Sequence, residues 1–255
     1  MRNPRVLVPN MITLAGLLVG FTAIMLILKD RHVEAAWLLL LCTILDKLDG
    51  TAARLLKASS SIGIELDSLS DLVTFVVSPA ILWGSLLLDG PTTPSLYWTT
   101  ICFSSLGLYV ASGALRLARF NVSASEPVMH YYFRGIATTL AGAFAVSLFL
   151  TMEAYQIPRE TYLQWVPPVI ALLGFGMNAP FLFPKVKRTS NRFMTTFFMI
   201  SGILSIPLVI FRLLPEVLLA ISASYVVLGF LAGNVYPGKR LRELKNPPPG
   251  QEHAT

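Results

Sequence analysis

The stretch DKLDGTAARLLKASSSIGIELDSLSD, residues 46–71, places four aspartates between two long apolar segments. The segment before it contains AAWLLLLCTIL (35–45), and the segment after it reads LVTFVVSPAILWGSLLL (72–88). A carboxylate at membrane depth costs about 2.5–3.5 kcal/mol on insertion scales, and four like charges also repel one another. An arrangement this unfavourable indicates a functional site rather than a packing feature.

The composition of the whole chain indicates a membrane protein. Of its 255 residues, 54% are hydrophobic and 13% are charged, and the mean hydropathy is +0.64. Soluble domains carry about a quarter charged residues. Apolar runs of about twenty residues favour spanning helices, because barrel strands would alternate over about ten. We therefore predict an all-α fold, a polytopic membrane helical bundle. Its eight transmembrane helices are expected at residues 9–28, 34–56, 63–88, 96–118, 135–153, 164–184, 193–211 and 214–235.

Lysine and arginine are distributed unevenly between the two sides that these spans define. With the amino terminus in the cytoplasm, sixteen of the 20 basic residues fall inside and four fall outside. The outer four are Lys29, Arg31, Arg159 and Arg212. By the positive-inside rule, we predict an integral protein of the cytoplasmic (inner) membrane, with both termini and the 46–71 region facing the cytoplasm. The net charge of +6 then reflects contact with anionic headgroups rather than nucleic acid, because no soluble module carries the basic residues.

Helical geometry places the residues of the 46–71 stretch on two faces. At about 100° per residue, one face of the first helix covers about 140° of arc. This face carries Asp46, Asp49, Gly50, Ala53 and Arg54. On the next helix, the residues at every fourth position are Gly63, Asp67 and Asp71. Because the loop between them is short, we predict that the two helices are antiparallel neighbours whose carboxylates converge at the cytoplasmic end.

A cluster of four carboxylates requires positive charge nearby. Arg54 and Lys57 alone cannot neutralise it, whereas two divalent cations can. All-oxygen ligands with no convergent histidine or cysteine favour Mg²⁺ or Mn²⁺ over zinc. Two such ions can clamp phosphoryl oxygens during an in-line displacement. Gly50 and Ala53 either leave the helix surface open to a ligand or only permit close helix packing. The hydroxyl groups of the serines at 59–61 can donate hydrogen bonds to a phosphate.

The spacing of these residues resembles the signature of the CDP-alcohol phosphotransferase family: Asp46-x2-Asp49-Gly50-x2-Ala53-Arg54-x8-Gly63-x3-Asp67-x3-Asp71. The resemblance implies a six-helix catalytic core, a homodimer and two divalent metal ions. It also implies transfer of a phosphatidyl group from CDP-diacylglycerol to an alcohol, with release of CMP. We expect this core at residues 1–190, an additional two-helix hairpin at 191–236 and a polar cytoplasmic tail at 237–255.

The same resemblance assigns roles to individual residues. Asp46, Asp49, Asp67 and Asp71 would hold the metal ions, and Asp71 would also be the base that takes the proton of the acceptor hydroxyl. The residues expected to contact the CDP moiety are Gly50, Ala53, Arg54, Ser60 and Gly63. The stretch PNMIT near the first helix resembles the nucleotide-contacting element of the family and adds Asn10 and Thr13, whose alternative role is an interfacial helix cap.

A second stretch bears on the alcohol acceptor. SGALRLARFNVS, residues 112–123, resembles the corresponding helix end of the branch that uses L-serine. A guanidinium can hold a carboxylate in a bidentate pair, so the expected acceptor-binding residues are Arg116, Arg119 and Asn121. Both arginines can instead be positive-inside anchors. One stretch departs from the family, GIATTLAGA at 135–143, where that branch has a proline-containing sequence.

Other functions are compatible with parts of the pattern. The same chemistry could act on glycerol phosphate, inositol phosphate or choline. An intramembrane prenyltransferase would show two separated aspartate clusters, whereas this chain has one. A divalent-cation transporter would place its carboxylates near the bilayer midplane, between broken helices. Here the carboxylates are expected at one face of the membrane, next to Arg54.

Overall fold

In the computed structural model of the protein, helices form wherever the sequence has long apolar runs. The structure describes residues 6–58, 60–88, 95–123, 132–184 and 192–235. The transmembrane candidates are α1 (Leu7–Ile27), α2 (His32–Leu56), α3 (Ser61–Asp71) continued by the π-helical segment η2 (Leu72–Val77) and α4 (Ser78–Leu88), α5 (Leu96–Ser123), α6 (Thr138–Ala154), α8 (Val166–Asn178), α9 (Arg192–Ile210) and α10 (Pro215–Phe230) with η6 (Leu231–Val235). Short helices α7 (Arg159–Tyr162) and η4 (Leu163–Trp165) precede α8. Each predicted span thus coincides with a helix, and the all-α fold class is confirmed.

The predicted boundary that differs most is the end of α8, which lies at Asn178 and not at residue 184. Pro180 follows two residues later, and a residue before proline is driven out of the helical region; Ala179 is indeed extended, with ψ at 147°. The chain then forms β2 (Leu182–Pro184), which pairs antiparallel with β1 (Tyr132–Arg134). The predicted tail at 237–255 lies outside the described residues, and the domain division at residue 190 stays a prediction.

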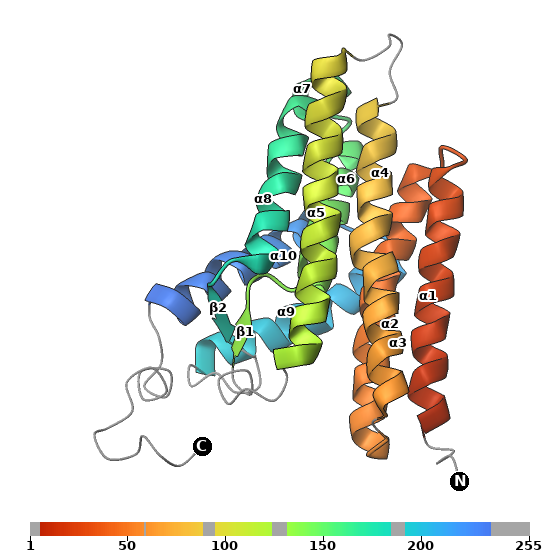
Figure 1. Ribbon diagram of the computed structural model, residues 1–255, viewed down its shortest axis with the longest axis vertical. Coiled ribbons are helices and arrows are strands. Elements are labelled where there is room, and N and C mark those ends of the chain that lie inside the picture. Colours follow the sequence, from red (N-terminus) through yellow and green to blue (C-terminus); the bar gives the residue numbers. More distant parts are fainter. Residues whose placement is uncertain (1–5, 59, 89–94, 124–131, 185–191, 236–255) are drawn as a thin grey trace.

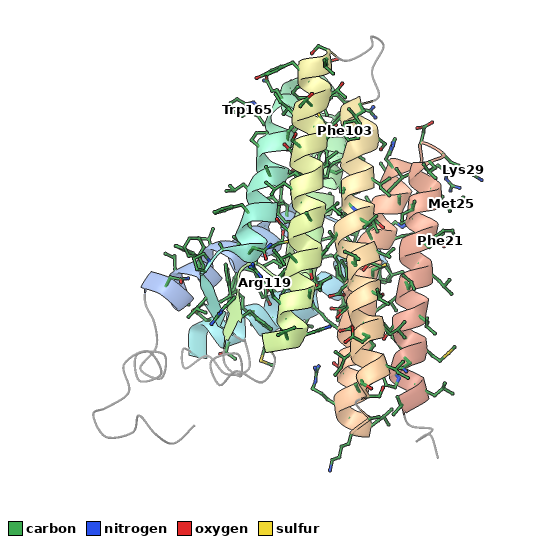
Figure 2. The ribbon with its side chains drawn as sticks, viewed as in Figure 1. Phe21, Met25, Lys29, Phe103, Arg119 and Trp165 are labelled. Carbon is green, nitrogen blue, oxygen red and sulfur yellow. The ribbon has the colours of Figure 1, made fainter. Side chains whose placement is uncertain are left out.

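The exterior of the helices is apolar, as expected for a protein in lipid. By length and composition, three helical stretches can cross a membrane: Leu7–Ile27, Ser61–Leu88 and Leu96–Val122. Shorter apolar helices accompany them at α6, α8, α9 and α10. Phe21, Phe103 and Trp165 point outward from α1, α5 and η4 (Figure 2) and are each more than half exposed. Soluble monomers rarely expose apolar surface on this scale, so the chain is a polytopic integral membrane protein.

The helices α1, α4 and α5 run along the long axis of the molecule, while α9 and α10 cross obliquely (Figure 1). α1 packs against α2, α5 against α8, and α6 against α10, and α9 also contacts α2. The segment η2 lies at the centre and contacts α1, α4, α5 and α6. The largest fully buried side chains are Trp83 on α4, Tyr109 on α5 and Phe149 on α6.

Close helix approaches at the centre depend on two glycines. A Cβ on Gly142 of α6 would lie 2.7 Å from the carbonyl oxygen of Phe75 in η2. A Cβ on Gly174 of α8 would lie 2.9 Å from the Cα of Tyr109 in α5. The Tyr109 hydroxyl then donates to the Phe75 carbonyl at 2.8 Å. These contacts fix the position of η2, and with it the end of α3 that carries the aspartates.

Candidate active site

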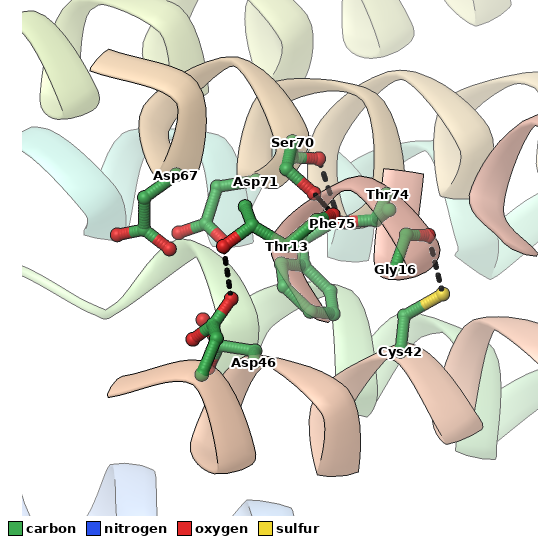
Figure 3. A pocket seen from close by; sticks show the side chains of 10 residues that line it. Thr13, Gly16, Cys42, Asp46, Asp67, Ser70, Asp71, Thr74 and Phe75 are labelled. Carbon is green, nitrogen blue, oxygen red and sulfur yellow. Dashed lines mark hydrogen bonds between the residues drawn. The ribbon is translucent and has the colours of Figure 1, made fainter. Parts of the chain in front are cut away.

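The four aspartates lie on two helices and face a common space. Asp46 and Asp49 are one turn apart in the second half of α2, and Asp67 and Asp71 are one turn apart at the end of α3. Residues three or four apart share one helix face. In the close view, Asp67 and Asp71 approach from one helix and Asp46 from the other (Figure 3). The predicted convergence of the two faces is therefore observed.

The packing around this space differs from the prediction. α1 packs against both α2 and α3, which contact each other far less. The two helices were predicted as antiparallel neighbours, and their carboxylates do converge, but each helix packs mainly against α1. The turn between them is short and places Lys57 in the left-handed region at φ 49°. With α1 as the shared neighbour, the carboxylates face a gap rather than a helix contact.

Three of the carboxylates are close enough to share one cation. Oxygens of Asp46, Asp49 and Asp67 lie within 4.8 Å of one another. Next to them is a cavity of about 10 Å³ that Asp71 also lines, room for about one water-sized particle. None of the four aspartates forms an ion pair with a basic side chain among residues 6–58, 60–88, 95–123, 132–184 and 192–235. A hard divalent cation would fit this all-oxygen set and supply the missing positive charge.

Asp71 occupies a distinct place at the edge of this group. It is the last residue of α3, directly before the π-helical segment η2. Its carboxyl group lies within hydrogen-bonding reach of Asp46 and within electrostatic reach of the Arg116 guanidinium. Segments of π-helix occur often at functional sites. The structure thus gives Asp71 one basic neighbour in addition to its acidic ones.

Thr13 connects α1 to the carboxylate group. Its hydroxyl Oγ1 lies 2.8 Å from Oδ2 of Asp49, to which it donates, and 3.0 Å from the carbonyl oxygen of Pro9. Both Thr13 and Asp49 are buried, with 6% of each exposed. Hydrogen bonds to charged groups are stronger than neutral ones, so Thr13 fixes the orientation of this carboxylate. Thr13 was predicted to contact the nucleotide, and it stands next to the proposed metal ligands.

Three of the predicted nucleotide-binding residues lie together at the start of α3. Ser60 is the N-cap of the helix, where its Oγ accepts a hydrogen bond from the Gly63 N–H at 3.0 Å. A Cβ on Gly63 would lie 2.9 Å from Oδ1 of Asn10 on α1. Gly63 therefore lets the Asn10 amide approach the first turn of α3.

The other predicted nucleotide-binding residues lie on the last turns of α2. Arg54 is exposed, and its Nη2 donates to Oγ1 of Thr51 at 3.1 Å. A Cβ on Gly50 would lie 3.5 Å from Nη1 of Arg54, so the guanidinium covers the bare face of that glycine. Ala53 is half-buried one turn further along. Gly50 and Arg54 thus form a neighbouring pair beside the carboxylates.

The three residues predicted to bind the acceptor do not converge. Arg116 is half-buried, and its Nη1 donates to Oγ1 of Thr138 at 3.0 Å. Its Nε is buried and has no hydrogen-bond partner among the described residues. Arg119 is exposed and its Nη1 donates to Oδ1 of Asn178 on α8 at 3.3 Å, on the side of α5 seen in Figure 2. Of the two arginines, Arg116 lies within electrostatic range of Asp71 without forming an ion pair. Residues three apart differ by about 60° around the helix, and Arg119 faces α8 instead.

Asn121 has a different partner, on α3. Its Nδ2 donates to Oγ of Ser68 at 3.0 Å, which ties the end of α5 to α3 beside Asp67. Ser68 and Thr138, which orients Arg116, were not among the predicted site residues. Thr138 lies in the 135–143 stretch. The departure of this stretch from the family pattern was the feature of the sequence that could have pointed to Thr138. That stretch therefore contributes a residue next to the site.

Comparison with known proteins identifies the family. The CDP-alcohol phosphatidyltransferase family matches residues 6–177. The CDP-diacylglycerol--serine O-phosphatidyltransferase of Helicobacter pylori is 32% identical over 193 residues, which are 73% of this chain and 75% of the relative. Relatives of the same name are 36% identical in Bacillus subtilis, over 56% of this chain and 76% of the relative, and 36% identical in Mycobacterium tuberculosis, over 56% of this chain and 47% of the relative.

The matched range contains the four aspartates and every residue around them that was predicted to bind nucleotide or acceptor. It also contains α1, whose Thr13 holds Asp49. Sequence spacing, the geometry of the carboxylates and the family match therefore agree. This chain belongs to the CDP-alcohol phosphatidyltransferase family.

Proposed function

We propose that this protein transfers the phosphatidyl group of CDP-diacylglycerol to the hydroxyl group of L-serine, which gives phosphatidylserine and CMP. The observation that carries the proposal is the aspartate quartet: it has the family spacing, and three of its carboxylates lie within 4.8 Å of one another. The choice of serine rests on the relatives, since those from Helicobacter pylori, Bacillus subtilis and Saccharomyces cerevisiae carry serine in their names.

Two divalent cations, Mg²⁺ or Mn²⁺, would be held by Asp46, Asp49, Asp67 and Asp71. Three observations support such a site: the proximity of the first three carboxylates, the small cavity beside them and the absence of ion pairs to these aspartates among the described residues. When bound, the ions would supply Lewis-acid stabilisation to the diphosphate of the donor lipid. Thr13 would keep the Asp49 carboxylate turned toward them.

Asp71 would act as the general base. A carboxylate oxygen of Asp71 accepts the proton of the serine hydroxyl, and the serine oxygen attacks the phosphorus that bears diacylglycerol. The bond between that phosphorus and the CMP oxygen breaks, and CMP leaves. Because Asp71 lies at the edge of the carboxylate group, next to Arg116, it can face an incoming acceptor. Positioning and preorganised charge supply most of the acceleration in this kind of chemistry.

Arg116 would bind the carboxylate of serine. Its buried Nε lacks a hydrogen-bond partner in the described structure, and its Nη1 is held by Thr138. A guanidinium fixed in this way can present two donors to a carboxylate. Arg119 and Asn121, which were expected to help, point to α8 and α3 instead. We therefore assign them to helix positioning.

The CDP moiety would lie along the ends of α1, α2 and α3. Asn10, Ser60 and Gly63 surround the first turn of α3, where free backbone N–H groups favour a phosphate. On the facing end of α2, Gly50 and Ala53 are small residues that leave the helix surface accessible, and the Arg54 guanidinium adds one positive charge. Both groups are next to the carboxylates, as a bound diphosphate requires.

The alternative within the family is another alcohol: glycerol phosphate, inositol phosphate or choline. A phosphorylated acceptor would be best served by several cations near Asp71. The Arg116 side chain lies within electrostatic range of Asp71, whereas that of Arg119 donates to Asn178. One guanidinium suits the single carboxylate of serine better than a phosphate. The cation-transporter alternative is not favoured, since the matching family is one of phosphatidyltransferases.

We also propose the setting in which the enzyme works. The excess of lysine and arginine on one side supports insertion in the cytoplasmic (inner) membrane, with both termini and the active site facing the cytoplasm. In keeping with this orientation, Lys29 lies at the end of the molecule opposite the start of α1 (Figure 2). The resemblance to the family supports a homodimer.

An acceptor panel tests the proposed function. Purified protein in lipid is supplied with CDP-diacylglycerol and either Mg²⁺ or Mn²⁺, and CMP release is measured with L-serine, glycerol 3-phosphate, inositol phosphate or choline. We expect release that depends on serine and produces phosphatidylserine. Release with another alcohol but not with serine would transfer the assignment to that alcohol. A lack of release with every acceptor would refute the enzyme assignment.

A further inference from the structure

A second and larger cavity adjoins the carboxylates. Its volume is about 430 Å³, which lies within the usual range of ligand pockets. The walls come from α2, α6, α9, α10 and the two short strands. Asp46 lines both this cavity and the small one among the carboxylates, so the two meet at that residue. Lys47 stands beside Asp46 at this junction.

The wall of the large cavity offers few hydrogen-bond donors, although it contains several hydroxyl groups. Thr139 lines the wall, and the five other hydroxyls donate to helix carbonyls: Thr43 to Leu40 at 2.7 Å, Ser147 to Ala143 at 2.6 Å, Ser205 to Gly202 at 2.8 Å, Ser222 to Leu219 at 2.9 Å and Tyr225 to Phe198 at 2.7 Å. The remaining lining is mostly aliphatic and aromatic. A polar occupant such as serine would lose its hydration there for few replacement hydrogen bonds, whereas a hydrocarbon chain needs none.

We propose that one acyl chain of the donor lipid lies in this cavity, with its diphosphate at the Asp46 end. This rests on the proposed function, because it requires a lipid donor at the carboxylates. The shared residue Asp46 puts the entrance next to the diphosphate, and the positive charge of Lys47 matches the negative headgroup. α9 and α10 form one wall, and they lie beyond residue 177, where the family match ends. The C-terminal hairpin of α9 and α10 thereby selects donor lipids by the length of the acyl chain.

Gly202 on α9 provides the test. A Cβ at this position would meet only the Tyr225 hydroxyl oxygen, at 4.0 Å, so a larger side chain enters open space in the cavity. In the variant Gly202→Phe, we expect the KM for a dioleoyl donor to rise at least about tenfold relative to that for a dihexanoyl donor, because the long chain loses its apolar burial. The activity with the short-chain donor should stay near that of the wild type.

Gly107 on α5 provides the matched control. A Cβ there meets no atom within 4 Å, and Gly107 does not line the cavity. Gly107→Phe should leave the ratio of the two KM values unchanged. An unchanged ratio in Gly202→Phe, or an equal rise for both donors, would overturn the acyl-chain proposal. If the wild type releases no CMP with either donor, the proposed function fails instead, and the two failures are thus distinguished.

Photolabelling of the wild-type protein gives a second readout that needs no turnover. The probe is CDP-diacylglycerol with a diazirine at the end of one acyl chain, and labelled peptides are located by mass spectrometry. We expect labels in α9 or α10 that excess unlabelled CDP-diacylglycerol removes. A phosphatidylcholine probe with the same diazirine reports bulk lipid. If both probes label the hairpin equally, and unlabelled donor does not compete, the cavity holds bulk lipid and the proposal is wrong.

Discussion

The hydrogen bond between Thr13 and Asp49 allows the metal-site proposal to be tested away from the carboxylates themselves. Replacing threonine by valine keeps the shape of the side chain and removes the hydroxyl that lies 2.8 Å from Oδ2 of Asp49. Asp49 is buried, so solvent cannot easily replace that donor. Hydrogen bonds to a charged group contribute about 1.5–3 kcal/mol. We expect most of this to appear as a weaker hold on the ions, because the carboxylate is no longer oriented toward them.

Loss of a residue that orients a metal ligand typically costs about 10–100-fold in metal affinity or activity. Thr13→Val should therefore raise the Mg²⁺ or Mn²⁺ concentration for half-maximal CMP release by about that factor. The rate at saturating metal should change much less. The assay is a metal titration of CMP release with serine and CDP-diacylglycerol held constant. Thr13→Ser, which keeps the hydroxyl, should restore the dependence on metal.

Thr22 supplies the matched control on the same helix. Its Oγ1 bonds only the carbonyl of Leu18, at 2.8 Å, and it is exposed and far from any carboxylate of the site. Thr22→Val should leave the titration unchanged. If Thr13→Val and Thr22→Val give the same metal dependence as the wild type, the hydrogen bond to Asp49 does not support a metal ligand, and the argument from orientation is refuted.

Four further predictions follow from the site. Asp71→Asn should abolish CMP release while the protein still inserts in the membrane; substantial residual turnover would contradict its role as base. EDTA should stop the reaction, and added Mg²⁺ or Mn²⁺ should restore it; activity that survives exhaustive chelation would exclude metal dependence. Gly63→Ala should raise the KM for the donor, because its Cβ would lie 2.9 Å from Oδ1 of Asn10; an unchanged KM would place the nucleotide elsewhere. In whole cells, a membrane-impermeant thiol reagent should label Lys29→Cys but not Lys57→Cys; the reverse pattern would invert the orientation.

The positions of the helices and the four aspartates could be predicted from local pattern alone. Long apolar runs specify helices in lipid, since every backbone polar group must be satisfied within the segment. The spacing of Asp46 with Asp49, and of Asp67 with Asp71, specifies a common face in each helix because the helical period is fixed. Neither inference requires knowledge of how the helices pack.

What could not be predicted depends on packing between distant segments. Thr13 and Asp49 are 36 positions apart, and their hydrogen bond exists because α1 packs between α2 and α3. Arg116 and Arg119 look equivalent in the sequence, yet α8 draws Arg119 to Asn178, while Arg116 turns to the carboxylates. Helical spacing alone gives two arginines on nearly one face, and only the neighbouring helices decide which one reaches the site.

The π-helical segment after Asp71 was also missed, although the sequence contains its cause. Pro79 has no N–H to donate to the carbonyl of Phe75, four residues earlier, and its ring would clash with that carbonyl in a regular α-helix. The helix widens at Leu72–Val77 instead, and the freed Phe75 carbonyl accepts a hydrogen bond from the Tyr109 hydroxyl at 2.8 Å. The widened turn changes the angular register between α3 and α4. Asp71 can therefore face the carboxylate group while α4 keeps its apolar contacts with α5, so that one proline within an apolar run reconciles a charged face with a lipid-embedded helix.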